Sequence, residues 1–183
     1  EYHPQVSPPL FTPLEWKRMQ DQQPSGLRTV GVLLVNYRQW NLTEKCVRSL
    51  FASRGVRVLV GLVDNDSREA VPGWVAETPD LFFSESSENL GLTVGNNMAY
   101  EMLSPLSPDF VMILNNDTEV EPDTLARLTG FLDTNPDACV AAPVVTFASR
   151  PDRIWSAGGR FSRWRMRLFQ TYRTLSDLPD EPV

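Results

Sequence analysis

The sequence predicts an α/β fold in which helices flank a mostly parallel, doubly wound sheet. Short, mostly apolar runs without helical periodicity occur at 30–35, 56–63 and 110–114. Segments in which apolar residues recur with helical spacing lie between these runs, and such alternation is typical of a parallel sheet. Each run is also followed at once by Asn or Asp, as expected where a buried strand ends at a polar crevice.

Size and charge limit the classes of protein. A chain of 183 residues suits one domain with a real core. The 17 basic and 23 acidic residues give a net charge of -6, which argues against a nucleic-acid partner. Cys46 and Cys139 form neither a metal-ligand spacing nor a disulfide framework, so we expect reduced core thiols. We see no apolar run of membrane-spanning length and no secretory leader, and we therefore expect a cytoplasmic protein.

The first elements follow from proline content and apolar spacing. Five prolines fall within residues 1–28, which predicts a proline-rich N-terminal extension, because proline disfavours long helices and central strands. The run at 30–35 then forms the first strand. Residues 41–52 have helical spacing, and either Asn41 or Thr43 can cap the start of that helix.

The middle of the chain completes the predicted sheet. The run at 56–63 predicts the second strand, and 81–83 predicts the third. A helix is expected at about 94–103. The run at 110–114 is short, apolar and without helical periodicity, so we expect a buried fourth strand.

Three further elements are expected beyond the fourth strand. Pro122 fits the first turn of a helix that ends near residue 132. The apolar stretch 138–145 predicts another strand. Residues 154–161 predict a strand with a tight turn.

Polar residues follow three of the predicted strands. They are Asn36-Tyr37, Asp64-Asn65-Asp66 and Asn115-Asn116-Asp117. Because the carboxyl ends of parallel strands meet at one edge of a sheet, we expect these groups to converge on one crevice. Asp117 would supply an oxygen ligand there, suited to a hard divalent cation and the phosphates that it carries.

Four short motifs occur in a fixed order along these elements. They are Val35-Asn36-Tyr37, Val63-Asp64-Asn65-x-Ser67, Asn89-x-Gly91-x-x-x-Gly95-Asn96-Asn97 and Leu114-Asn115-x-Asp117-Thr118. Together they resemble the inverting glycosyltransferases of family 2, which have the GT-A fold. The likeness is to the rhamnosyltransferase-like branch that builds bacterial surface polysaccharides. Each motif alone is weak, but four in this order are fairly specific.

The resemblance covers roughly residues 29–165 and implies a nucleotide-sugar-binding domain there, with a tail at 166–183. Asn36 and Tyr37 would form the nucleotide wall, with Tyr37 placed against the base or ribose. Asp64 and Asn65 would read the edge of uracil or thymine, since a carboxylate or amide oxygen accepts a hydrogen bond from the base N3–H. A UDP- or dTDP-linked donor is therefore favoured.

The other two motifs would hold the rest of the donor. The resemblance places Asn89, Gly91 and Asn97 under the diphosphate and sugar, with Gly91 allowing close approach of the backbone. It matches the triplet Asn115, Asn116 and Asp117 to the Asp-x-Asp metal motif, so that Mg²⁺ or Mn²⁺ would bind Asp117. Such an ion would neutralise the charge that develops on the departing diphosphate. With Asn115 in place of an acid, Asp117 is the only carboxylate of the triplet.

Plainer interpretations remain open for each motif. Asn and Asp favour turns through local hydrogen bonds, so the polar clusters after the strands can be ordinary turns. Tyr37 can simply pack its loop, and Gly91 can be a common loop residue. The arginines that alternate with aromatic residues after residue 159 suit an anionic membrane surface or lipid-linked acceptor. They equally suit a solvated segment whose arginine stems cover apolar neighbours.

The catalytic residue is not identified by the sequence. Inverting transfer needs a general base, and no stretch after the fourth strand matches the acidic segments that supply it in this family. Three hypotheses follow. In the first, the chain is the donor-binding part of a larger transferase that acts on a glycan or lipid-linked acceptor. In the second, it is a nucleotide-sugar-binding module that pairs with a separate acceptor half, and in the third, it is a nucleotidyltransferase-like or structural α/β module. The third lacks a Gly-rich signature after the first strand. The first implies a place in the cytoplasm at the inner face of the membrane.

Overall fold

The computed structural model describes residues 26–158, 160–162, 164, 167–169 and 172–178. The chain divides into two compact units, one up to Thr129 and one from Gly130 onward. Each unit is described by itself. Nearly all of the predicted extension at 1–28 lies outside the described residues, as do parts of the arginine-rich stretch, including Arg163 and Arg165.

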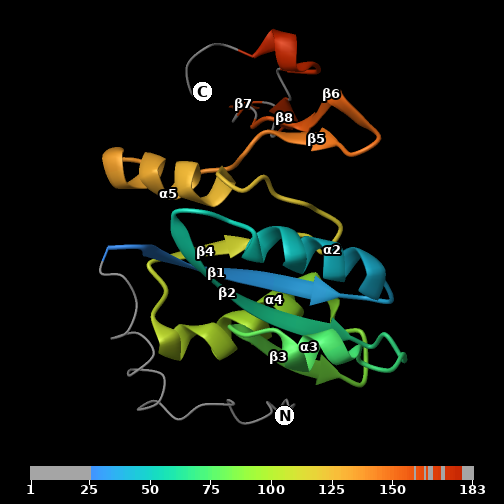
Figure 1. Ribbon diagram of the computed structural model, residues 1–183. Helices are drawn as coiled ribbons and strands as arrows, with labels where there is room; N and C mark the ends of the chain where they lie inside the picture. The colour runs from blue at the N-terminus through green and yellow to red at the C-terminus, as the bar shows by residue number, and fades with distance from the viewer. Residues whose placement is uncertain (1–25, 159, 163, 165–166, 170–171, 179–183) are drawn as a thin grey trace. The chain divides into compact units, whose positions relative to one another are not determined.

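The first unit is built on a four-stranded sheet. Its strands are β1 (Arg28–Asn36), β2 (Val56–Asn65), β3 (Leu81–Ser86) and β4 (Phe110–Ile113). They lie in the order β3-β2-β1-β4, and all three neighbouring pairs are parallel (Figure 1). The predicted α/β class with a mostly parallel, doubly wound sheet is confirmed.

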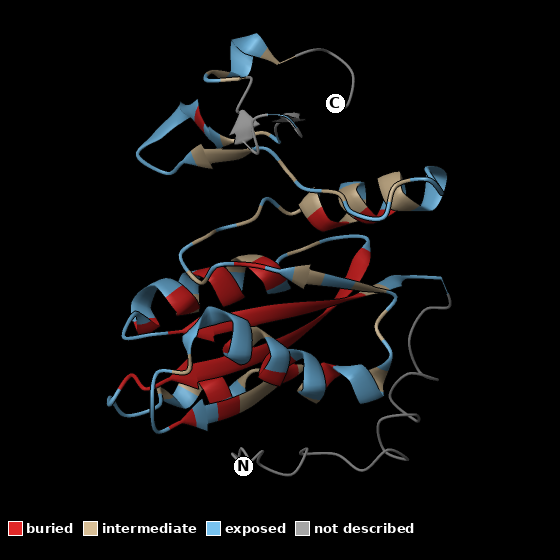
Figure 2. Cartoon of the chain, turned by 180° about the vertical axis from the view of Figure 1, so that it is seen from behind, coloured by how far each residue is buried: buried red, intermediate tan, exposed pale blue. Residues whose placement is uncertain are grey.

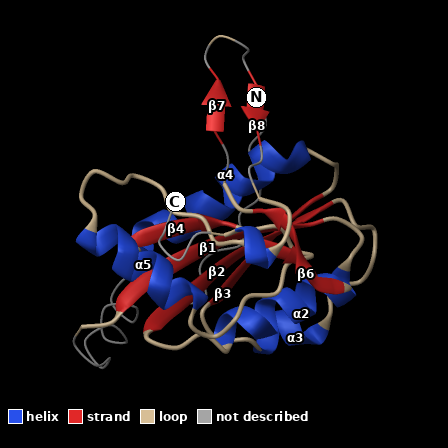
Figure 3. Cartoon of the chain, turned by 90° about the horizontal axis from the view of Figure 1, so that it is seen from above, coloured by secondary structure: helices blue, strands red, loops and turns tan. Residues whose placement is uncertain are grey.

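Helices cover both faces of this sheet. They are α2 (Trp40–Phe51), α3 (Gly73–Glu77), α4 (Gly91–Leu103), the short 3-10 helix η1 (Ser104–Leu106) and the first residues of α5 (Thr124–Thr134). Figure 3 shows the sheet between α4 on one side and α2 and α3 on the other. Parallel neighbours need such crossover helices, because the chain must return to the same edge before each new strand.

Successive side chains of a strand point to opposite faces, and this alternation separates two cores. On one face Val32 and Leu34 pack with residues of α2, α3 and the start of α5. On the other face Leu33 and Val63 pack with Met98, Ala99 and Leu103 of α4. β1 and β2 are buried along almost their whole length, as the red strands in Figure 2 show. Burial on both faces explains why their sequences are apolar without alternation.

Two glycines allow α4 to lie directly on the sheet. A Cβ at Gly61 of β2 would come within 2.7 Å of the backbone oxygen of Ala99, and a Cβ at Gly95 of α4 within 2.8 Å of Val35. Both distances are shorter than atoms tolerate, so the close contact depends on the missing side chains. This packing fixes the position of α4 against the carboxyl ends of β1 and β2.

Several boundaries agree with the prediction, and others need correction. The helix expected at 41–52 is α2, but the prediction that Asn41 or Thr43 caps its start was wrong. Gln39 is the N-cap residue, and its side chain forms no capping hydrogen bond. Thr43 instead points into the interior and bonds to β1. The helix after β4 begins at Thr124, so Pro122 lies in the preceding turn and not in the first helical turn.

The predicted strand at 110–114 is present as β4, but the expectation that it is buried was wrong. Within the described residues β4 is the edge strand of the sheet, and Val111 and Ile113 are 45% and 65% exposed. The strand predicted at 138–145 was also mistaken, since residues 138–144 form no strand and the next one begins at Val145. Pro143 removes a backbone donor from that stretch. Cys139 is exposed and is not a core thiol.

The second unit contains two antiparallel hairpins within its described residues. β5 (Val145–Phe147) pairs with β6 (Arg150–Ser156), and β7 (Arg160–Ser162) pairs with β8 (Arg167–Phe169). The strand and turn predicted at 154–161 correspond to the end of β6 and the start of β7. A 3-10 helix η2 (Leu175–Asp177) follows. No helix in the described part of the chain has the length and apolar character to cross a membrane.

Candidate functional site

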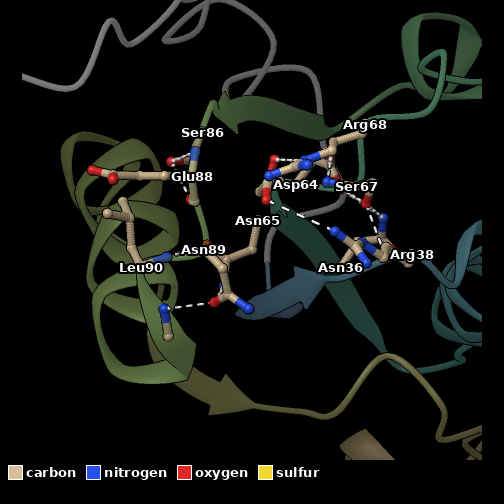
Figure 4. A network of polar contacts seen from close by, with 12 residues as sticks. Asn36, Arg38, Asp64, Asn65, Ser67, Arg68, Ser86, Glu88, Asn89 and Leu90 are labelled. Carbon is tan, nitrogen blue, oxygen red and sulfur yellow. Dashed lines mark hydrogen bonds and ion pairs between the residues drawn. The ribbon is translucent and has the colours of Figure 1, made fainter.

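The three predicted polar clusters meet at the carboxyl edge of the sheet. Asn36 and Asp64 are register partners at the ends of β1 and β2. The side-chain amide of Asn36 donates a 2.7 Å hydrogen bond to Asp64 Oδ1, as Figure 4 shows. The Leu114 N–H donates to the Leu33 carbonyl over 3.2 Å, which brings the residues after β4 beside the end of β1. The predicted convergence of the strand ends is therefore confirmed, while the roles of the residues remain predictions.

Asn36 is the centre of a buried network. Its amide also donates to Ser67 Oγ over 2.9 Å, and its Oδ1 accepts from the Thr43 hydroxyl over 2.7 Å. The same oxygen accepts a longer bond of 3.4 Å from Asn116. Asn36 is 0% exposed, so both of its donors and its acceptor are used inside the protein. No polar atom of this side chain is left for a ligand.

Asp64 is held from several directions. The Ser67 hydroxyl donates to Oδ1, and the Ser67 backbone N–H donates to Oδ2 over 3.3 Å. Ser67 in turn accepts from the Arg38 backbone N–H over 2.9 Å. Asp64 as a whole is 4% exposed. These bonds compensate the cost of burying its charge, and they fix its direction.

Asn65, the next residue of β2, points to the opposite face. Its amide donates to Asn89 Oδ1 over 2.9 Å, and its own Oδ1 accepts from the Leu90 N–H over 2.8 Å. Asn89 Oδ1 also accepts from the Gly91 N–H over 3.0 Å. Gly91 has a φ of +78° and open space at its Cβ position, so it provides both the turn and an uncovered backbone. These bonds join the end of β2 to the start of α4 (Figure 4).

Three residues with a strained backbone follow the strands at this edge, Arg38 after β1 and Asp66 and Arg68 after β2, and of these the sequence had indicated only Asp66. Arg38, Asp66 and Arg68 have φ values of 56°, 64° and 56°, a left-handed conformation that only glycine adopts without cost. Arg68 Nε donates to Asp66 over 3.0 Å, and Arg38 lies 4.0 Å from the same carboxylate. The bond to Asp66 raises the pKa of Arg68 above its usual value. No glycine marks the strained positions Arg38 and Arg68, whereas Asp66 lies in the turn-favouring stretch from Asp64 to Ser67.

Tyr37 is 40% exposed and lies under the Arg38 guanidinium, which is 4.8 Å from the ring centroid. Such a pair is a cation–π contact, which fixes the ring plane relative to the backbone. Asn97, on the first half of α4, is exposed and lies between the buried residues Gly95 and Met98. The sequence had placed both Tyr37 and Asn97 in the nucleotide-sugar site, and both are open to solvent.

The residues after β4 form a turn that presents Asp117. The Thr118 N–H donates to the Asn115 carbonyl over 3.2 Å, and the Asn116 amide donates to Thr43 Oγ1 over 2.8 Å. Asn115 and Asp117 are exposed, whereas Asn116 is half-buried. In the described part of the chain, no hydrogen bond or ion pair engages the Asp117 carboxylate. It is the free acid at the end of this strand.

The donor set can be tested against a divalent cation. The described residues contain no group of three or more His, Cys, Asp or Glu side chains that could enclose a metal ion. Asp117 supplies one carboxylate, and Mg²⁺ sites with nucleotides typically use one or two carboxylates with phosphate oxygens and water. The residues therefore fit an ion that arrives with a diphosphate, and they do not fit a metal cage made by protein alone.

A hollow of about 760 Å³ on the first unit lies away from these residues. It is lined by the second half of α2, by Trp74 and Glu77 of α3, and by Thr78, Pro79 and Asp80 before β3. Those segments lie at the amino edge of the sheet. We place the candidate site at the opposite edge, because the exposed carboxylate of Asp117 and the glycine turn at Gly91 lie there.

The sequence profile described as glycosyl transferase family 2 matches residues 31–183. The chain therefore belongs to glycosyl transferase family 2. No curated protein matches it.

Among solved structures, TarS residues 1–349 of S. aureus matches with a TM-score of 0.52 and 18% identity, covering 60% of this chain and 33% of that one. TarS in complex with UDP-GlcNAc matches with a TM-score of 0.51 and 19% identity, over 60% and 32%. The mannosyltransferase PcManGT of Pyrobaculum calidifontis, in complex with GDP-Man and Mn²⁺, matches with a TM-score of 0.49 and 23% identity. The match covers 73% of this chain and 41% of that one. The likeness to TarS confirms the GT-A fold. The chain spans about a third of the TarS structure.

Proposed function

We propose that this chain is the donor-binding part of an inverting glycosyltransferase. It takes a sugar from a nucleotide-diphosphate donor, with UDP or dTDP favoured, and transfers it to a glycan or lipid-linked acceptor with the help of Mg²⁺ or Mn²⁺. One observation carries the proposal: hydrogen bonds join three strand ends that are distant in sequence, and Asp117 is left free at the same edge. A rhamnosyltransferase-like role in surface polysaccharide synthesis, at the inner face of the membrane, remains part of this proposal.

The ends of β1 and β2 would bind the nucleoside. The exposed ring of Tyr37, held by Arg38, offers a face for the base or ribose. Asp64 Oδ1 is filled by the Asn36 amide and the Ser67 hydroxyl, but Oδ2, which accepts from the Ser67 backbone N–H, keeps a lone pair that can accept from a pyrimidine N3–H. Asn65 extends the same edge toward Asn89. We assign Asn36 to the support of Asp64, because its own polar atoms are all engaged.

The start of α4 would bind the diphosphate and the sugar. Asn89, Gly91 and Asn97 lie on or just before the first turns of this helix of 13 residues. Unpaired backbone N–H groups and the helix dipole favour anions at a helix N-terminus. Gly91 leaves the backbone uncovered there, so that a phosphate can approach it.

Asp117, with Asn115 and Asn116 beside it, would hold the divalent cation. When bound, the cation neutralises charge on the diphosphate as it departs. The chain's own contribution is to present one carboxylate in a fixed loop and to leave the other coordination positions to phosphate and water. Binding of metal and binding of nucleotide should therefore depend on each other.

A second interpretation is a nucleotide-sugar-binding module that needs a separate acceptor half. It is favoured by the network itself, in which Asp64 and Asp66 are engaged by Asn36, Ser67 and Arg68, so that neither is free to act as a general base. The two interpretations share the donor site. They differ in whether the chain turns over its donor when an acceptor is supplied.

Titration calorimetry with UDP, dTDP and GDP, each with and without Mn²⁺, tests the shared donor site. We expect UDP or dTDP to bind more tightly than GDP, and to bind more tightly with Mn²⁺ than without. Asp117→Ala should remove the metal dependence and keep metal-free binding. Equal, weak heats for all three nucleotides under both conditions would contradict the proposal.

A further inference from the structure

One face of α2 lies against the residues that carry Asp117. Thr43, Cys46 and Ser49 are spaced three apart, so they occupy successive turns on the same side of the helix. Thr43 and Cys46 are fully buried, and Ser49 is half-buried. We call these three the anchor residues. Sequence reasoning treated Thr43 as a helix cap and Cys46 as a core thiol.

Each anchor residue contacts the loop 115–120. The Thr43 hydroxyl accepts from the Asn116 amide over 2.8 Å. The Cys46 thiol donates to the Asn115 carbonyl, with 3.9 Å between sulfur and oxygen. The Ser49 hydroxyl accepts from the Val120 N–H over 3.1 Å. The contacts lie on both sides of Asp117 in the chain and leave Asp117 itself free.

The directions of these bonds are mutually consistent. The Thr43 hydroxyl donates to Asn36 Oδ1, which leaves its lone pairs for Asn116. The Ser49 hydroxyl donates to the Cys46 carbonyl over 2.7 Å, which leaves its lone pairs for Val120. Burial, with the nearby charges of Asp117 and Glu119, raises the pKa of Cys46 to about 12, so the thiol keeps the proton that it donates.

We propose that Thr43, Cys46 and Ser49 are positioning residues that hold the loop 115–120 and fix the direction of the Asp117 carboxylate. This proposal rests on the proposed function, in which the loop 115–120 carries the metal ligand Asp117. A site with one protein ligand for the metal depends strongly on how that ligand is held. Through Thr43 and Asn36 the loop is also bonded to Asp64, so the nucleoside end and the metal end of the site share one network.

Substitution of Thr43 tests this on the full chain. Thr43→Val keeps the shape and removes the hydroxyl, while Thr43→Ser keeps the hydroxyl. Thr129→Val is the matched control: Thr129 is buried on α5 and bonds only to carbonyls of its own helix. The readouts are the Mn²⁺ affinity at saturating UDP, from the electron paramagnetic resonance of free Mn²⁺, and the UDP affinity without metal.

We expect Thr43→Val to weaken Mn²⁺ binding about tenfold, as when a partner of a metal ligand is lost. Metal-free UDP affinity should stay within about twofold, and Thr43→Ser and Thr129→Val should behave like the unchanged chain. The proposal is overturned if Thr43→Val leaves Mn²⁺ affinity unchanged, or if Thr43→Ser fails to restore it.

Ser49→Ala gives a test that needs no ligand. The Val120 amide should lose protection from hydrogen exchange in this variant, because its acceptor is removed, while the Thr118 amide should keep its protection. Unchanged exchange at Val120 would overturn the proposal. If the unchanged chain binds no Mn²⁺ with UDP, the proposed function fails, and the exchange experiment still decides whether α2 holds the loop.

Discussion

Asn36 donates a 2.7 Å hydrogen bond to Asp64 at the matched ends of β1 and β2. This bond joins two residues that lie 28 positions apart in the chain. Both are almost fully buried, although they stand at the polar edge of the sheet. The pair shows that the carboxyl edge has a rigid interior layer beneath its exposed residues.

The Asn36–Asp64 bond predicts a large effect of Asn36→Ala on stability. The substitution removes one of the three hydrogen bonds to the buried Asp64 carboxylate and the Asn36 acceptor of the Thr43 hydroxyl, which should lower the free energy of unfolding by about 2–3 kcal/mol. Urea denaturation measures this. Asn41→Ala, at an exposed position of α2, should change it by less than about 0.5 kcal/mol. Equal values for the two variants would contradict the role of Asn36.

The two cysteines should differ sharply in reactivity. Burial raises the pKa of Cys46 from 9.0 to about 12, so its thiolate is about 1000-fold scarcer at neutral pH than that of an ordinary thiol. Cys139 is exposed. We expect a thiol reagent to label one cysteine in the native chain and two in denaturant. Rapid labelling of Cys46 in the native chain would contradict the described burial.

The same pKa shift makes stability depend on pH. Between pH 9 and 12 the folded chain keeps the Cys46 proton, whereas the unfolded chain releases it, so unfolding becomes easier as the pH rises. The stability contributed by the neutral thiol is complete below pH 9. Urea denaturation should show the advantage of the unchanged chain over Cys46→Ala shrinking by about 1.4 kcal/mol between pH 8 and 10. A constant difference would argue against the raised pKa.

Two glycine substitutions should have opposite signs. Gly61→Ala would place a methyl group 2.7 Å from the Ala99 carbonyl and push α4 from the sheet, which should cost about 1–3 kcal/mol. Gly130→Ala meets no atom within 4 Å on α5 and should stabilise that helix by about 0.5–1 kcal/mol. Thermal unfolding measures both. A neutral Gly61→Ala would mean that α4 is not in close contact with β2.

The fold could be predicted because its signals are local. Apolar runs and helical spacing gave β1, α2, β2 and α4 within a few residues, and the polar strand ends indicated the carboxyl edge. The position of β4 at the edge of the described sheet depends on neighbours that its own residues do not encode, so its apolar run predicted too much burial.

The candidate site was predicted in part. Exposed residues such as Tyr37 and Asp117 could be named from motifs. Thr43 could not be recognised as part of the network, because a threonine near a helix start suits a cap equally well. Its partners Asn36 and Asn116 come from other strands. The left-handed backbone at Arg38 and Arg68 could not be predicted either, because arginine rarely adopts this conformation.

The Mn²⁺ affinity of the nucleotide-bound chain tests the central claim most directly. Asp117→Asn keeps the size of the side chain and removes its charge, and Glu119→Gln makes the same change two residues further along the exposed loop. With UDP saturating, we predict that Asp117→Asn weakens Mn²⁺ binding at least about tenfold, and that Glu119→Gln changes it by less than about twofold. Equal Mn²⁺ affinity in the unchanged chain and Asp117→Asn would contradict the assignment of Asp117 as the metal ligand.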